Sequence, residues 1–147
     1  MKIASAAFAT ILLTAFSARG ADDIDVGLID QKPPAKKELE APKSDVKVAE
    51  VGLNETVKGK VAKDEKKHLY IVINPLGIPN SWWVQHEVSR DGESFSAESQ
   101  FGEADAGKGE LFAILAVATD KKWSVGEKLE SLPENALYTK VKMVKRK

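Results

Sequence analysis

The amino-acid sequence predicts an all-β protein in which seven strands form a two-sheet sandwich. Short apolar or alternating runs recur from residue 47 to the C-terminus, and turn-forming residues separate them. This arrangement is typical of sandwiches. The runs "ETVKGKVA" and "LYTKVKMVK" alternate apolar and charged residues, whereas "HLYIVIN" and "ELFAILAVA" are almost continuously apolar. The first kind fits strands with one wet face, and the second fits strands covered on both faces.

The predicted strands are, in order, Val46–Val51, Glu55–Ala62, His68–Asn74, Trp82–Ser89, Ser94–Phe101, Leu111–Ala118 and Leu137–Val144. Between the last two, Lys121–Asn135 lacks a strand pattern. We expect it to be a longer connection that packs Trp123 and Leu129 over one end of the sandwich. Residues 47–147 would then be the folded domain.

The segments before this domain differ in composition. Residues 1–20 contain Lys2, an apolar run from Ile3 to Phe16 and a small residue at position 20, which is the pattern of a secretory signal peptide. The apolar run is shorter than the roughly 20 residues of a membrane span. Residues 21–46 are charged and contain three prolines, which predicts a flexible linker; the alternative is a short helix at Ala35–Leu39, with prolines on both sides. The sequence thus predicts an exported protein, periplasmic or secreted, without a membrane span.

Composition excludes several kinds of chemistry. The chain has no cysteine, so disulfides and thiolate metal sites are excluded. Its two histidines, His68 and His86, lack the spacing of a metal site, and we expect no metal and no cofactor. Basic and acidic residues number 22 each; loss of Lys2 and Arg19 with the signal peptide would leave a net charge of −2. This balance predicts no general attraction to nucleic acid.

The stretch "SRDGES" predicts a hairpin, since Asp91-Gly92 suits a two-residue type I′ loop between two alternating runs. The resulting register would bring Trp82 opposite Phe101 and place His86 on the same inward face. One face of this predicted ladder pairs Trp82 with Phe101, Val84 with Ser99, His86 with Ala97 and Val88 with Phe95. The other pairs Trp83 with Gln100, Gln85 with Glu98 and Glu87 with Ser96.

The candidate ligand-binding site lies on the polar face of this hairpin. It consists of Trp83, Gln85, Glu87, Glu98 and Gln100. An exposed aromatic ring can stack on an apolar ligand surface while amides and carboxylates fix its orientation. This predicts a binding module for a glycan or an extended protein segment. In the alternative interpretation, Trp83 packs beneath the loop "NPLGIPN" or the linker, and the protein is a structural component of envelope assembly without a small ligand.

A hydrolytic function is the remaining alternative. In the predicted register, Glu87 and Glu98 would lie about 7–8 Å apart diagonally, within the ~6.5–9.5 Å range of inverting glycoside hydrolases. A wet sheet face does not desolvate a general acid, so we expect no catalytic residues and no enzymatic activity. The basic C-terminus from Lys140 to Lys147 would protect an edge strand from aggregation, or offer a patch to an anionic polymer.

The run from Leu69 to Ala118 resembles immunoglobulin-like or fibronectin-III-like modules of bacterial envelope and secreted proteins. The matching features are Asn74-Pro75, Trp82-Trp83 with Gln85, Asp91-Gly92 with Phe95, and Gly107 and Gly109 before Phe112–Ala118. The resemblance implies an immunoglobulin-like sandwich and a non-catalytic role in adhesion, binding or envelope structure.

Overall fold

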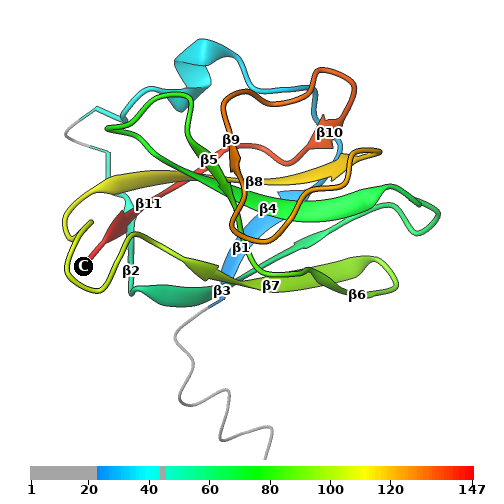
Figure 1. The fold of residues 1–147 in the computed structure, drawn as a ribbon, viewed down its shortest axis with the longest axis horizontal. Coiled ribbons are helices and arrows are strands. Elements are labelled where there is room, and N and C mark those ends of the chain that lie inside the picture. Colours follow the sequence, from blue (N-terminus) through cyan, green and yellow to red (C-terminus); the bar gives the residue numbers. More distant parts are fainter. Residues whose placement is uncertain (1–22, 44–45) are drawn as a thin grey trace, which may run out of the picture.

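The computed structural model describes residues 23–43 and 46–147, so the predicted signal peptide, residues 1–20, lies outside the described residues. In these ranges the chain forms eleven β-strands and one short 3-10 helix, η1 (Lys36–Leu39). The strands form two sheets (Figure 1), which confirms the all-β class. In the same ranges, no helix has both the length and the apolar character that a membrane crossing needs.

The smaller sheet has the order β1-β3-β7-β6. Its strands are β1 (Ile24–Leu28), β3 (Asn54–Lys60), β6 (Ser89–Asp91) and β7 (Ser94–Gln100). In the antiparallel β3–β7 pair, Val57 lies opposite Ala97, and both side chains are buried. Because side chains alternate along a strand, one face of this sheet is apolar and the other meets solvent.

The larger sheet has the order β2-β11-β8-β4-β5-β9, and β10 also pairs with β8. Its strands are β2 (Ala49–Val51), β4 (His68–Pro75), β5 (Trp82–Val84), β8 (Leu111–Thr119), β9 (Lys128–Leu129), β10 (Leu137–Tyr138) and β11 (Lys142–Arg146). The long central strands β4 and β8 pair antiparallel along their whole length.

Two hydrophobic cores explain why β4 and β8 are continuously apolar. One core lies between the sheets and includes Ile71, Ile73 and Phe112. The other, which we call the outer core, lies on the opposite face of the larger sheet and includes Val72 and Leu115. Figure 1 shows the segments of η1, β9 and β10 on one side of β4 and β8, and β3, β6 and β7 on the other. On its outer face the larger sheet is therefore covered by η1 and by the irregular segments around β9 and β10, from which Leu39, Trp123 and Leu132 pack against the second core.

The prediction that residues 21–46 form a flexible linker is wrong for β1. This strand pairs parallel with β3, with Ile24 opposite Val57. Ile24 and Val26 of β1, and Ile29 just after it, are buried in the core between the sheets. The backbone N–H of Gln31 then donates to the carbonyl of Tyr138, at 2.7 Å. Burial of these three apolar residues outweighs the charges around them, because the charged side chains face solvent.

The predicted number of strands is also wrong. The run Trp82–Ser89 is divided between β5 and β6, which belong to different sheets, and Leu137–Val144 is divided between β10 and β11. Strands β1 and β9 form in segments predicted to be linker and connection. Two strand pairs, β1 with β3 and β2 with β11, are parallel, which a meander of antiparallel hairpins does not contain.

The predicted hairpin exists with a different loop and a shorter ladder. Asp91 pairs with Ser94, so the two loop residues are Gly92 and Glu93. Gly92 has a φ of 63°, as the first central position of a type II′ turn requires. The register is shifted by two residues, which leaves the inward face of β7 unchanged. The ladder ends at Ser89–Ser96, and the predicted pairs from Trp82–Phe101 to Glu87–Ser96 do not form.

Tyr138 leads to a prediction about alkaline stability. Its ring is fully buried in the outer core, its hydroxyl donates to the carbonyl of Pro133, and burial raises the pKa of this hydroxyl above its ordinary value of 10.0. The folded state therefore keeps a proton that the unfolded state loses above about pH 10. The contribution of the Tyr138 hydroxyl to the free energy of unfolding is complete below pH 10. It declines above pH 10, by up to about 1.4 kcal/mol for each pH unit.

We expect urea unfolding at pH 9 to 11 to show a smaller alkaline loss of stability in Tyr138→Phe than in the unsubstituted protein. Comparing the two proteins at each pH removes the contributions that both proteins share. Equal slopes against pH would contradict the assignment to Tyr138.

Candidate ligand-binding site

The two adjacent tryptophans of β5 lie on opposite faces of the larger sheet. Trp82 pairs with Leu129 of β9 and is 4% exposed, whereas Trp83 pairs with Ile73 of β4 and is 42% exposed. The predicted burial of Trp82 is confirmed, and of the two interpretations of Trp83 the structure agrees with the exposed ring. The predicted environment of Trp82 is wrong, because it packs in the outer core, while Phe101 contacts Phe112 edge-on in the core between the sheets.

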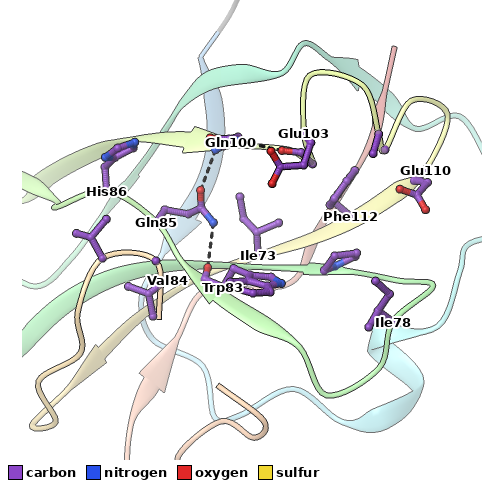
Figure 2. Close-up of a pocket in the computed structure, with 16 residues that line it drawn as sticks. Ile73, Ile78, Trp83, Val84, Gln85, His86, Gln100, Glu103, Glu110 and Phe112 are labelled. Carbon is purple, nitrogen blue, oxygen red and sulfur yellow. Dashed lines mark hydrogen bonds between the residues drawn. The ribbon is translucent and has the colours of Figure 1, made fainter. Parts of the chain in front are cut away.

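Trp83 lies beside a pocket of about 540 Å³. Figure 2 shows Trp83 and Ile78 along one side of this pocket and Glu103, from the β7–β8 loop, across from them. Ile78 and Val125, which also line it, are more than half exposed. Apolar side chains that line an open pocket, with a few polar groups among them, are characteristic of ligand sites.

Gln85 joins the two sheets beside the pocket. Its Oε1 accepts a hydrogen bond from the backbone N–H of Gln100, in β7, at 2.8 Å, and its Nε2 donates to the carbonyl of Trp83 at 3.0 Å (Figure 2). Its own N–H donates to the carbonyl of Ile71, in β4. The side chain is 8% exposed. Gln85 was predicted to contact the ligand, but both ends of its amide hold the backbone, so it positions the pocket wall.

The other predicted site residues do not form one surface. Gln100 lines the Trp83 pocket, and its Nε2 donates to the carbonyl of Gly102 at 2.8 Å. Glu87 is exposed and lines a smaller, second pocket. Glu98 pairs with Thr56 on the outward face of β7 and lines neither pocket. The predicted site of five residues is therefore divided, because the strand that was expected to unite it ends at Val84.

Three polar residues of the pocket were not predicted as site residues. Glu103 and Glu110 come from the β7–β8 connection, which the sequence shows only as a turn-rich segment, and both are exposed. His86 was expected on an inward strand face beside Ala97. It is exposed instead and lines the pocket, since the chain leaves the larger sheet after β5.

Arg146 fixes the loop that carries Glu103. Its Nη1 donates to the carbonyls of Phe101, Glu103 and Ala106 at 2.8, 2.7 and 3.1 Å, and the residue is 5% exposed. Gly102 has a φ of 86°, and a Cβ there would lie 2.7 Å from the carbonyl oxygen of Ala106. Arg146 was predicted to lie in an exposed basic C-terminus; its guanidinium is instead surrounded by loop carbonyls.

The comparisons with known proteins do not identify the chain. Neither models of protein families, nor curated proteins, nor solved structures match it. Within the described ranges, no group of three or more His, Asp or Glu residues is arranged to hold a metal ion. The pocket beside Trp83 is therefore the feature from which we argue function.

Proposed function

We propose that this chain is a non-catalytic binding module of the cell envelope that recognises carbohydrate in the pocket beside Trp83. The observation that carries this proposal is the exposed ring of Trp83 in a pocket whose opposite side presents carboxylates. Sugar rings have apolar C–H faces and hydroxyl edges. A face can stack on the indole, and the hydroxyls can donate to Glu103 and Glu110.

The pairing of β5 favours carbohydrate over the alternative ligand, an extended protein segment. Strand addition needs a free edge with unpaired backbone groups. One edge of β5 is paired with β4 and the other with β9. Beyond the ladder, the N–H of Val84 donates to the carbonyl of Glu127, and the N–H of Gly126 donates to the carbonyl of Val84. A ligand beside Trp83 would therefore be recognised through side chains.

The proposed cellular role rests on the sequence. The pattern of residues 1–20 supports export to the periplasm or the cell exterior. The two-sheet architecture is compatible with kinship to immunoglobulin-like modules, and we retain that kinship as part of the proposal, although the parallel pairs of β1 and β2 are additions to an antiparallel sandwich.

A binding role also agrees better with the pocket than the two alternatives do. Glu103 and Glu110 are both exposed, whereas general acids usually act where water is excluded. The ladder that would have placed Glu87 beside Glu98 does not form. A purely structural envelope protein would not require an exposed indole in a pocket, so we place this alternative second.

The test is an array of neutral oligosaccharides built from glucose, galactose, mannose or N-acetylglucosamine, probed with the mature chain. For a carbohydrate that binds, Trp83→Ala is expected to lower the affinity at least about tenfold, equivalent to ~1.4 kcal/mol. The melting temperature should change little, because the ring is 42% exposed.

Leu137→Ala is the matched control. Leu137 is 38% exposed, close to Trp83 in exposure, and lines neither pocket, so its removal should leave binding unchanged. Concentration-dependent self-association of the chain, together with no carbohydrate bound at millimolar concentration, would contradict the proposal and favour the structural alternative.

A further inference from the structure

The second pocket adjoins the first. It has a volume of about 390 Å³, and both Gln85 and Val125 line the two pockets. The segment that follows β5 passes between them, since His86 lines the first pocket and Glu87 the second. The two hollows therefore adjoin, with Gln85 and Val125 at their junction.

Aromatic rings line the second pocket as well. Tyr70 and Trp123 lie with their ring centroids 4.8 Å apart, and His68 lies 6.4 Å from Tyr70. The backbone N–H of Trp123 donates to the Tyr70 hydroxyl at 2.9 Å, which holds the irregular segment after β8 against β4. All three rings line the pocket. Each pocket thus offers an indole, Trp83 in the first and Trp123 in the second.

The charged groups around the two pockets favour a neutral ligand. The exposed carboxylates of Glu103 and Glu110 in the first pocket disfavour an anion. The second pocket has both signs, with Lys67 and Glu87 at its border. Arg90 also lines the second pocket, but its guanidinium nitrogens already donate to the carbonyls of Ala62, Lys63, Glu65 and Gly92.

We propose that the second pocket is a further subsite of the carbohydrate site, and that the ligand is a linear, neutral oligosaccharide long enough to contact both Trp83 and Trp123. This inference rests on the proposed function. Two adjoining pockets that are each lined by a tryptophan suit a ligand with several sugar rings, because separate rings of one chain can stack on the two indoles. Hydroxyls over the second pocket would accept from Lys67 and donate to Glu87.

The first experiment is a calorimetric titration of the mature chain with a series from monosaccharide to hexasaccharide of the sugar selected by the array. Affinity should rise at least about tenfold between the shortest bound member and the length that fills both pockets, and then remain constant. Linked subsites raise affinity because the second contact is made within the same complex.

Substitutions then separate the two subsites. We expect His68→Ala and Glu87→Ala to lower the affinity for the long oligosaccharide several-fold and to leave the affinity for the shortest bound member unchanged. Trp83→Ala should lower the affinity for both. These exposed positions are chosen because Trp123 also packs against the outer core and its removal could unfold the segment. The matched control is Glu98→Ala, an exposed carboxylate that lines neither pocket.

The three tryptophans supply an independent measurement. In ¹H–¹⁵N spectra the long oligosaccharide should shift the indole N–H signals of Trp83 and Trp123 but not that of buried Trp82, and the shortest member should shift that of Trp83 alone. Equal affinity at every length, with a Trp83 shift and no Trp123 shift, would overturn the second subsite and leave the proposed function intact. Binding of no carbohydrate, or of an unstructured peptide instead, would overturn both.

Discussion

Val26→Asp is expected to destabilise the protein by about 4 kcal/mol, out of the ~5–15 kcal/mol that stabilises a typical domain. Val26 lies in β1, is 6% exposed and packs in the core between the sheets. An aspartate there either buries a charge or keeps an unpaired carboxyl group in apolar surroundings, and the packing of valine is lost as well. Urea unfolding of the mature chain, followed by circular dichroism, measures the change.

Leu28→Asp is the matched control for this substitution. Leu28 is in the same strand, carries a side chain of comparable polarity and is 47% exposed, so its replacement should cost well under 1 kcal/mol. If residues 21–46 behaved as a flexible linker, the two variants would unfold at the same urea concentration. That outcome would show that β1 does not contribute to the stability of the sandwich.

Arg146→Met is expected to cost about 3 kcal/mol. Methionine retains much of the apolar stem but leaves the carbonyls of Phe101, Glu103 and Ala106 without the donor that now serves all three. Hydrogen bonds to a charged group contribute about 1.5–3 kcal/mol each, and some of this would be recovered when water enters the loop. Thermal and urea unfolding provide the measurement.

The control Lys145→Met, at the neighbouring residue, separates the effect of the lost hydrogen bonds of Arg146 from the effect of losing a positive charge. Lys145 is also in β11 but is exposed, so its replacement removes one positive charge without removing a buried donor. Arg146→Met should also lower the affinity for the proposed oligosaccharide, because the loop that presents Glu103 is no longer held in place. Equal stabilities of the two variants would contradict the assigned role of Arg146.

Local patterns in the sequence predicted much of the sandwich correctly. The all-β class, the central strands β4 and β8 and the inward face of β7 follow from hydrophobic alternation and from continuous apolar runs, which depend on neighbours along the chain. The different environments of Trp82 and Trp83 follow in the same way, because successive side chains on a strand point to opposite faces.

Errors occurred where a strand changes sheet. The run from Trp82 to Ser89 has the composition of one strand. The chain nevertheless leaves the larger sheet after Gln85, whose side chain accepts from the backbone of Gln100, and β6 begins in the other sheet. No local pattern distinguishes a strand that continues from one that crosses between sheets, since both expose alternate side chains. Four of the five predicted site residues therefore line one or other of two pockets, and Glu98 lines neither.

The sequence by itself determined that the chain forms an all-β fold without disulfides, and that Trp82 and Trp83 point to opposite faces of their strand. The tertiary structure alone decided what surrounds Trp83. Glu103 and Glu110 reach the pocket because Arg146, near the C-terminus, holds the β7–β8 loop, and β1 joins the smaller sheet because β3 offers an edge. Such contacts join residues that are distant along the chain, and their energies depend on a geometry that exists only after the sheets have packed.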